Sequence, residues 1–551
     1  MRLLVYQDFR TKLIFIINFL FLTIIVFTLF RLILFFSYYS AIFNGLNTIQ
    51  VLKAFIFGLR FDISIIIIFY ALPFTIILLP VKSFKIIKIS AFITVIMFSI
   101  MIATLFGDFV YFPESKRHIN DELLTVWYDK SFIIKYTLIN CWHILLFIIA
   151  FIISSYLFFI NFMKKRYKPV KITIVKNIWI TILILLILLL LFRSRISGKP
   201  LEISDIYIMV NNTTQANLTL NGVFTSFHVL RKKNVSLKNN YSFNAALINV
   251  QKILLSKNEF IVDKEYPLIR QLNYPATVSK PNVCIVLLES WSPKYIDSLS
   301  GTKYGVTLNF DNIVSNGIVF TNAYASGVRS IFGLSATFTG IPLIPGLPHF
   351  AYGLELNKVF SIADVFNKLG YYTSFMQSSR RDSYQMCYIT KNIFNVQESF
   401  GKEDMPNLMN YIGEHHFGYD YDLLMFLGRK ALEVNNKKKP FFIFAFTGTT
   451  HTPFNITTSA FEKYPRTNDE NKYLNTLYYS DFAIGELIRK SKQDGWFENT
   501  IFIFLSDHGL NTLQKNDSIK DKFHIPFVIY APKILKPQKI NYTVSQLDLI
   551  P

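Results

Sequence analysis

Two residues with metal-binding side chains stand directly after an uninterrupted apolar run near the end of the chain. Residues 501–506 read IFIFLS and are followed by Asp507, His508 and Gly509. A run so rich in Ile and Phe predicts a strand that is buried on both faces of a parallel sheet. Ligand-binding groups gather at the carboxyl ends of strands in open α/β sheets, so we expect chemistry at Asp507 and His508.

A second apolar run ends in a carboxylate in the same way. Residues 283–288 read VCIVLL and are followed by Glu289. Because parallel strands end at one edge of a sheet, we expect Glu289, Asp507 and His508 to converge. Two carboxylates and an imidazole suit Zn²⁺ or Mn²⁺, and three protein ligands with an open position are typical of a catalytic metal site.

A hydroxyl group lies between these two strands in the sequence. Residues 324–342 read YASGVRSIFGLSATFTGIP and predict a helix that begins at Ser330 after a glycine-containing loop. Serine at a helix start is commonly an N-cap, which binds the backbone of its own helix. The same position favours phosphate and oxyanions, and a neighbouring metal ion lowers the pKa of a hydroxyl. Ser330 is therefore both a candidate cap and a candidate nucleophile.

Short apolar runs alternate with helix-like stretches from about residue 280 onward. This alternation predicts an α/β domain with a mainly parallel sheet. The sequence contains no internal repeat, no P-loop and no dinucleotide-binding glycine fingerprint. The expected strands are residues 283–288, 371–376, 441–447, 501–506 and 526–531, and the expected helices are residues 359–370, 422–434 and 473–493.

The first 195 residues hold most of the apolar excess of a 551-residue chain that is 52% hydrophobic. Five successive stretches are each about as long as a bilayer span and are nearly free of charge. A single stretch of this kind is often a buried core helix, but five in succession favour membrane spans. The predicted spans are residues 13–36, 62–80, 86–107, 139–162 and 177–193.

Basic residues concentrate in the short connections at one end of these spans. Lys82, Lys85 and Lys88 lie between the second and third spans, and six Lys or Arg residues lie between positions 164 and 176. The positive-inside rule then makes the N-terminus cytoplasmic, and an odd number of spans places everything after residue 195 outside. The formal net charge of +21 is explained by this topology without nucleic acid as a partner.

Arg60 and Asp62 stand at the entrance to the predicted second span. Charges at a membrane edge usually act as interfacial anchors, and a contact with a lipid headgroup is the alternative. The chain has three cysteines, which indicate no disulfide framework and therefore do not fix the compartment.

The chain resembles the lipoteichoic acid synthase and phosphoglycerol transferase branch of the alkaline phosphatase–sulfatase superfamily. In that family one divalent cation is held by a Glu, a Thr or Ser nucleophile and an Asp–His pair. The resemblance assigns these roles to Glu289, Ser330, Asp507 and His508, with Mn²⁺ or Zn²⁺ as the expected ion and Mg²⁺ as an alternative. The motifs that carry the resemblance are, in order, RISGKPLEIS, NLTLNGVFTSF, LLESW, SGVRSIFGLSA, THTPF, SDHG and HIPFVIYAP.

The resemblance also points to three substrate-contacting residues. His451, in TTHTPF, matches a family histidine near the substrate phosphate, and a locally bonded loop histidine is the alternative. His524 either supports the ligands from behind or simply begins a strand, and Arg329 either neutralises phosphate or is an ordinary exposed arginine. The family's substrate-contact motif is poorly kept in SSRRDSYQMC, residues 378–387, which leaves the headgroup and the acceptor open.

We therefore expect three parts in the chain. Residues 1–195 form a five-helix transmembrane domain, residues 196–270 a juxtamembrane helical linker, and residues 271–551 an extracytoplasmic sulfatase-like domain. Members of the family continue into further helices beyond the position of Pro551, which suggests a truncated C-terminus. The resemblance implies a multi-pass protein of the bacterial inner membrane, and the oligomeric state is left open.

The expected activity is transfer of a phosphoglycerol headgroup from a membrane phospholipid to a cell-envelope glycan or polyol-phosphate acceptor through a phospho-serine intermediate. A phosphoethanolamine transferase is the nearest alternative, although such enzymes usually carry several disulfides. A sulfatase requires a C/S-x-P-x-R pattern, and SIFGL lacks both the Pro and the Arg. A silent membrane scaffold or a transporter is disfavoured by the complete ligand set and by spans without internal charges.

Overall fold

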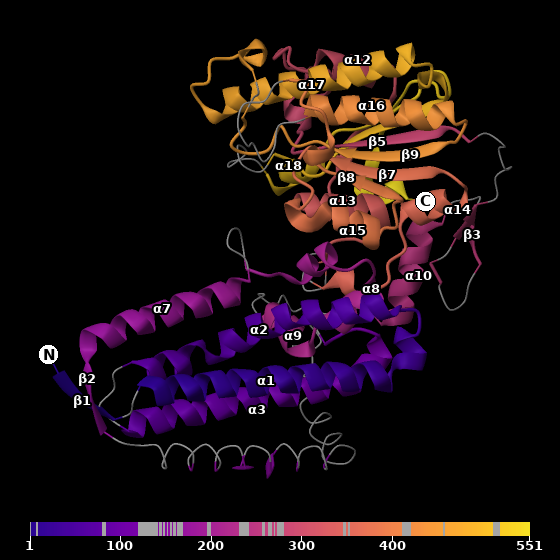
Figure 1. Cartoon of the computed structure of the whole chain (residues 1–551). Helices are drawn as coiled ribbons and strands as arrows, with labels where there is room; N and C mark the ends of the chain where they lie inside the picture. Colours follow the sequence, from indigo (N-terminus) through magenta and orange to yellow (C-terminus); the bar gives the residue numbers. More distant parts are fainter. Residues whose placement is uncertain are drawn as a thin grey trace.

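The computed structural model consists of a bundle of long apolar helices and an α/β domain, with short helices between them (Figure 1). The structure describes residues 2–6, 9–79, 84–119, 169–194, 200–230, 242–255, 259–262, 267–268, 270–272, 280–344, 349–350, 353–409, 420–455, 458–510 and 518–550, together with scattered positions between 142 and 161.

Three N-terminal helices are long and apolar enough to cross a membrane. They are α1 (Phe9–Ser37), α2 (Thr48–Leu78) and α3 (Phe84–Ser115), and they lie side by side in Figure 1. A further helix, α7 (Ile174–Arg193), lies against α2, and its apolar part covers only Ile178–Arg193. A short antiparallel sheet of β1 (Arg2–Tyr6) and β2 (Pro169–Thr173) joins the N-terminus to the segment before α7.

The five predicted spans are not supported by the described residues, in which three helices reach the length of a span. The predicted span 139–162 lies outside the described residues apart from scattered positions, and 177–193 corresponds to the shorter apolar part of α7. The predicted start of the second span, residue 62, was also wrong. Helix α2 begins at Thr48, where the Asn47 side chain accepts a hydrogen bond from the Gln50 N–H at 2.9 Å.

Because α2 begins so early, Arg60 and Asp62 lie inside the helix and not at its entrance. Asp62 is fully buried in an ion pair with Arg31 of α1, at 2.7 Å. The Arg60 side chain donates to the Ser194 carbonyl just after α7. Asp62 is therefore paired with Arg31 between two helices and is not the interfacial anchor that was expected. Helices α1 and α2 also contain charged residues, contrary to the expectation of spans without them, and this pair lies where the bundle contacts α8.

Short elements connect the bundle to the α/β domain. The first helical turn, η2 (Ile203–Ile208), is followed by α8 (Thr213–Thr219) and α9 (Gly222–Leu230), which contact the bundle helices. Helix α10 (Phe243–Leu254) and the antiparallel pair β3 (Glu259–Ile261) and β4 (Arg270–Leu272) complete this region.

A nine-stranded mixed sheet forms the centre of the α/β domain, in the order β11-β6-β12-β10-β5-β9-β7-β8, with β13 paired to β6. Strands β10, β5, β9, β7 and β8 run parallel, whereas β12 runs antiparallel to both β10 and β6. The expectation of a mainly parallel sheet was thus wrong for the part built from β12, β6 and β11, because an apolar run has the same pattern in either direction. The strands are β5 (Asn282–Leu288), β6 (Ile318–Tyr324), β7 (Tyr372–Gln377), β8 (Glu398–Phe400), β9 (Phe441–Phe446), β10 (Thr500–Ser506), β11 (His524–Ile525), β12 (Phe527–Tyr530) and β13 (Gln538–Ser545).

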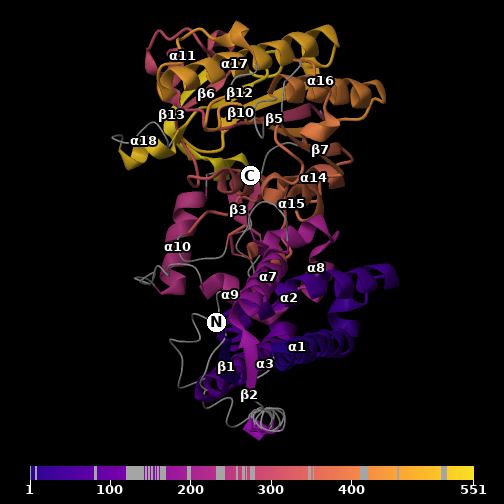
Figure 2. The same cartoon turned by 60° about the vertical axis from the view of Figure 1, so that its left-hand side comes forward.

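Helices cover both faces of this sheet (Figures 1 and 2). One face packs against α12 (Leu308–Ser315), α16 (Asp420–Asn436) and α17 (Asp469–Gln493). The other packs against α13 (Ser330–Thr339), α14 (Ile362–Lys368) and α15 (Met386–Asn392) in a core that continues into the helix bundle.

Burial on both faces explains the unbroken apolar runs in the sequence. In β5, the side chains of Cys284, Val286 and Leu288 lie in one core and those of Ile285 and Leu287 lie in the other. All five strands and all three helices that the sequence predicts in this domain are present, with ends shifted by a few residues.

Candidate active site

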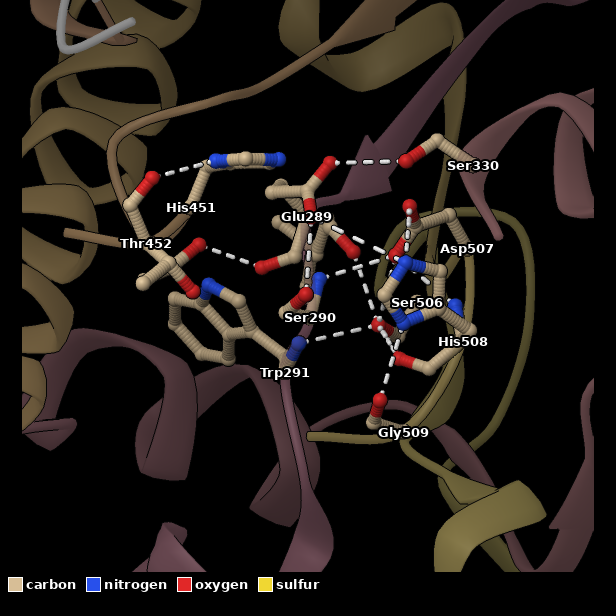
Figure 3. Close-up of polar contacts among 12 residues, drawn as sticks. Glu289, Ser290, Trp291, Ser330, His451, Thr452, Ser506, Asp507, His508 and Gly509 are labelled. Atoms are coloured by element: carbon tan, nitrogen blue, oxygen red, sulfur yellow. Dashed lines mark hydrogen bonds and ion pairs between the residues drawn. The ribbon is translucent and has the colours of Figure 1, made fainter. Parts of the chain in front are cut away.

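Glu289, Asp507 and His508 meet at the carboxyl ends of β5 and β10 (Figure 3). These two strands are parallel neighbours, with Leu288 opposite Ser506, so the residue that follows each strand reaches the same place. One ligand atom from each of the three side chains lies within 4.8 Å of the others. The convergence predicted from the two strand ends is present in the structure.

The turn after β5 ties the two strand ends together. Ser290 has a φ of 53°, a left-handed conformation uncommon for a residue with a side chain, and its N–H donates to Asp507 Oδ1 at 2.8 Å. The Ser290 hydroxyl donates to Glu289 Oε1 at 2.7 Å. The next N–H, of Trp291, donates to the Ser506 hydroxyl at 2.9 Å. Both carboxylates are therefore held by hydrogen bonds from one turn.

The imidazole of His508 has one nitrogen directed at the carboxylates. Its Nδ1 lies 2.8 Å from the Gly509 carbonyl, which can only accept a hydrogen bond, so Nδ1 carries a proton. Its Nε2 lies 3.3 Å from Asp507 Oδ2 and 3.8 Å from Glu289 Oε1. A backbone carbonyl that fixes Nδ1 in this way is the usual arrangement for a histidine that binds a metal through Nε2.

Burial beside a second carboxylate changes the protonation of Asp507 and His508. Burial, reinforced by the charge of Glu289, raises the pKa of Asp507 to about 7. For His508, burial acts to lower the pKa, but the Asp507 and Glu289 carboxylates outweigh it and raise the pKa above its usual value. A buried aspartate that resists ionisation beside another carboxylate is typical of a site that binds positive charge.

The donor set fits a divalent cation. The Ser330 hydroxyl donates to Glu289, and Asp507 Oδ2 is buried and accepts no hydrogen bond from the described residues, with His508 Nε2 3.3 Å away. An unpaired buried carboxylate oxygen is costly unless a cation satisfies it. Two carboxylates and the Nε2 of an imidazole within 4.8 Å of one another match the preferences of Zn²⁺ and Mn²⁺.

Ser330 is the first residue of α13 and is directed at this cluster. Its hydroxyl donates to Glu289 Oε2 at 3.1 Å (Figure 3). The N-cap position belongs to Arg329, and no side chain caps the helix. Of the two roles that the sequence left open for Ser330, capping is therefore not observed, and the hydroxyl faces the carboxylates.

A glycine allows α13 to approach the end of β10. A Cβ atom at Gly333 would lie 2.2 Å from the Asp507 carbonyl oxygen, closer than real Cβ atoms come to backbone. Gln546, near the end of the sequence, secures the same region, because its amide donates to the Ser506 and Asp507 carbonyls at 2.7 Å. Gln546 also accepts a hydrogen bond from the Ser326 N–H at 2.8 Å and so binds the loop before Ser330 to the strand end.

The loop after β9 carries His451 beside the cluster. The loop is bound to β5, since the Thr447 hydroxyl accepts the Glu289 N–H at 2.9 Å and the Thr450 hydroxyl donates to the Glu289 carbonyl. The half-buried His451 has its Nδ1 2.6 Å from the Thr452 carbonyl, and its ring extends toward Glu289 (Figure 3). Both the predicted role near phosphate and the alternative of local bonding are compatible with this position.

The other two predicted contact residues lie on the elements around the site. Arg329 is exposed immediately before Ser330. His524, on β11, has its Nε2 2.9 Å from the Thr321 carbonyl of β6 and its ring 5.4 Å from that of Tyr324. These contacts correspond to the strand-start alternative for His524.

The sequence analysis did not identify the residues that hydrogen-bond to the turns and loops carrying Glu289, Asp507 and His451. Ser506 and Thr447 each stand at the end of an apolar strand run. The first hydroxyl residue after such a run could have been predicted to bind the neighbouring strand end. Asp420 accepts the Gly448 and Thr449 N–H groups of the His451 loop at 2.8 and 3.2 Å, and Gln546 acts as described above. Neither residue stands in a pattern that could have identified it.

The close contact at Gly333 leads to a testable expectation. Gly333→Ala should push α13 away from Asp507, lower the free energy of unfolding by about 1–3 kcal/mol and weaken Mn²⁺ binding at the Glu289–Asp507–His508 cluster. Gly428→Ala in α16 is the matched control, because a Cβ there has its nearest neighbour, Lys490 Cγ, at 3.6 Å. Denaturant unfolding and calorimetric Mn²⁺ titration of both variants check this. Unchanged stability and unchanged Mn²⁺ affinity of Gly333→Ala would contradict it.

Comparison with known proteins agrees with this architecture. Residues 281–551 match the Sulfatase family model. The chain is 27% identical over 146 residues to a lipoteichoic acid synthase-like protein of Bacillus subtilis (strain 168), an alignment of 23% of this chain and 24% of that protein. It is 25% identical over 231 residues to phosphoglycerol transferase I of Escherichia coli (strain SMS-3-5 / SECEC), covering 39% of this chain and 29% of that protein. Each alignment spans less than a third of the relative's own length.

A solved structure of a protein in the alkaline phosphatase superfamily from Vibrio parahaemolyticus is also similar. It has a TM-score of 0.49 and 24% identity, and the match covers 56% of this chain and 73% of that chain. The resemblance drawn from the motifs is confirmed by the family match and the relatives. Residues 281–551 are a sulfatase domain, and this chain is similar to relatives named lipoteichoic acid synthase-like and phosphoglycerol transferase.

Proposed function

We propose that this protein is a membrane-bound phosphotransferase that moves the phosphoglycerol headgroup of a phospholipid to a cell-envelope acceptor through a covalent intermediate on Ser330. The observation that carries the proposal is the Ser330 hydroxyl, 3.1 Å from Glu289 Oε2 at the edge of the Glu289–Asp507–His508 cluster. The names of the relatives support the reaction class, and the three apolar helices support a donor that stays in the bilayer.

Glu289, Asp507 and His508 would hold one divalent cation beside Ser330. A cation bound there supplies positive charge that neutralises the two carboxylates and stabilises the negative charge of a phosphoryl group. Zn²⁺ and Mn²⁺ suit the donor set, and Mg²⁺ is the alternative. Arg329, exposed next to Ser330, and His451 are the proposed contacts for the phosphate oxygens.

The first step forms a bond from Ser330 Oγ to the phosphorus of the donor and breaks the bond from phosphorus to the diacylglycerol oxygen. The serine proton leaves toward Glu289 Oε2, which the hydroxyl already contacts. The diacylglycerol oxygen takes up a proton, for which His451 is the candidate donor. Because Ser330 begins a ten-residue helix, the phosphoryl group lies near the positive end of the dipole of α13.

The second step returns the enzyme to its starting state. A hydroxyl of the acceptor attacks the phospho-serine and gives its proton to His451, the bond from phosphorus to Ser330 breaks, and Ser330 regains the proton that Glu289 took up. The acceptor is a glycan or a polyol phosphate of the envelope. In this scheme residues 1–195 lie in the membrane with a cytoplasmic N-terminus, residues 196–270 lie along its surface, and residues 271–551 work outside the cytoplasm.

The covalent step can be tested by intact-protein mass spectrometry after incubation with phosphatidylglycerol and Mn²⁺. The unaltered chain should gain the mass of glycerophosphate less water, whereas Ser330→Ala should gain nothing and should transfer nothing. Ser335→Ala is the matched control on the same helix, because its hydroxyl donates to the Ile331 carbonyl one turn earlier and does not face the cluster. This control should form the adduct normally.

The same measurement distinguishes the donor headgroups. An adduct with the mass of phosphoethanolamine, obtained from phosphatidylethanolamine but not from phosphatidylglycerol, would replace phosphoglycerol transfer by the alternative. A Ser330→Ala variant with full transfer activity would overturn the nucleophile itself.

Cation binding should depend on pH in a defined direction. In the cation-free protein, Asp507 with its pKa raised to about 7 carries a proton at lower pH, and a cation must displace this proton. The affinity for Mn²⁺ should therefore increase as the pH rises toward about 7 and level off above it. Calorimetry in two buffers of different ionisation enthalpy measures the proton release. Affinity without pH dependence or proton release would contradict this expectation, and Asp507→Asn should bind weakly at every pH.

A further inference from the structure

A buried ion pair joins two bundle helices to α8. Arg31 donates to both carboxylate oxygens of Asp62, at 2.7 and 2.8 Å, and both side chains are almost fully buried. The same guanidinium donates to the carbonyls of Leu218 and Thr219, at 3.1 Å each. These carbonyls belong to the last turn of α8, where a positive charge is favourable because the carbonyls lack partners within the helix.

Neighbouring residues complete this site. The Asn221 amide donates to Asp62 Oδ1 at 2.7 Å, so the carboxylate is bound from α1 and from the segment after α8. Gly58 of α2 leaves room for the guanidinium, because a Cβ there would lie 2.5 Å from Arg31 Cζ. The ion pair is thus enclosed by close packing and hydrogen bonds.

A second polar contact of the same kind lies on α3. Asp108 Oδ2 is 2.7 Å from His118 Nδ1, and His118 Nε2 is 2.6 Å from the Asn217 carbonyl of α8. The Asn217 amide in turn donates to the Leu356 carbonyl of the sulfatase domain at 3.1 Å. Helix α8 is therefore bound to α1, α2 and α3 on one side and to the sulfatase domain on the other.

Further hydrogen bonds continue from this region into the sulfatase domain. The Tyr207 hydroxyl of η2 donates to the Glu355 carbonyl. The Gln385 amide, at the N-cap of α15, donates to Asp205 Oδ1 at 2.6 Å. The Asn392 amide donates to the Tyr207 carbonyl at 3.2 Å. The contacts come from several segments of the domain, which fixes its orientation as well as its position.

The Arg31–Asp62 pair and the Asp108–His118 contact each lie about one bilayer thickness from the opposite end of the bundle. At 1.5 Å per residue, Arg31 is about 28 Å along α1 from Lys12, and Asp108 is about 30 Å along α3 from Lys88. Lys12 marks that opposite end, where its ammonium donates to the Leu79 carbonyl after α2, at 2.8 Å. A bilayer whose apolar core begins near Lys12 and Lys88 would end at these polar contacts, on the side nearer α8.

We propose that Arg31 and Asp62 are positioning residues whose ion pair fixes α8 on the bundle and, through α8, holds the sulfatase domain at one height and orientation over the membrane. A buried ion pair contributes little stability compared with apolar residues of similar volume, but it specifies one arrangement of the helices that carry it. The consequence for activity rests on the proposed function: Ser330 reaches a phosphodiester that stays in the bilayer only when the domain is held over it.

The test compares a membrane donor with a soluble one. Arg31→Met combined with Asp62→Leu removes both charges and leaves neither buried alone. Full-length protein in nanodiscs is assayed with long-chain phosphatidylglycerol in the disc and with short-chain, water-soluble phosphatidylglycerol. Turnover of the long-chain donor should fall by about tenfold or more, because misplaced reactants react slowly, and turnover of the soluble donor should be unchanged. Lys12→Met, a buried charge at the other end of α1, is the matched control and should leave both rates unchanged.

A distance measurement tests the positioning without relying on activity. Nitroxide labels are placed at Leu52 of α2 and at Leu369 after α14, which are both exposed, with Cys141 replaced by serine. The distance distribution should be narrow in the otherwise unaltered chain and in Lys12→Met, and broad or shifted in the double variant. An unchanged distribution in the double variant would overturn the proposal.

The two measurements separate the possible failures. If the double variant loses turnover equally on both donors and the distance between the two labels is unchanged, Arg31 and Asp62 do not position the domain. They would then contribute only to the stability of the protein. If the unaltered protein acts on neither donor, the proposed phosphoglycerol transfer fails, and the distance distribution alone decides whether Arg31 and Asp62 position the domain.

Discussion

The parallel pairing of β5 with β10 is the constraint on which the candidate site depends. It places Glu289 and Asp507 at adjacent strand ends, where the sheet and its covering helices exclude water from both. Burial and, after it, repulsion from the neighbouring Glu289 carboxylate raise the pKa of Asp507. A divalent cation relieves this repulsion. The Ser330 helix, the His451 loop and Gln546 all pack around that pair and derive their arrangement from it.

The order of elements in the sulfatase domain could be read from the sequence because strands buried on both faces leave long apolar runs with sharp ends. The polar residues at those ends, Glu289, Asp507 and His508, could be recognised for the same reason. The antiparallel direction of β12 could not be predicted, because an apolar run has the same pattern in either direction. Contacts such as those of Asp420 and Gln546 join segments far apart in the chain and have no local signature.

The membrane part shows a different limit of sequence reasoning. Hydropathy predicted five spans, of which three are long apolar helices in the described residues, and it placed Arg60 and Asp62 at the border of a span. Their partners are the Ser194 carbonyl just after α7 and Arg31 on α1, so only the packed structure shows that these charges are satisfied between segments far apart in the sequence. The same contacts bring α8 against the bundle and connect the anchor with the domain that carries Ser330. Through α8, the helix bundle and the domain that carries Ser330 are held in one arrangement, as the proposed action on a membrane lipid requires.

The central claim is that Ser330 and a single cation form one phosphotransfer site. The most direct measurement is a crystal structure of the full chain with Mn²⁺ and phosphatidylglycerol, with anomalous diffraction recorded at the manganese edge. The account predicts one anomalous peak bound by Glu289, Asp507 and His508, and density for glycerophosphate joined to Ser330 Oγ. An anomalous peak elsewhere, or a phosphoryl group joined to another residue, would contradict it.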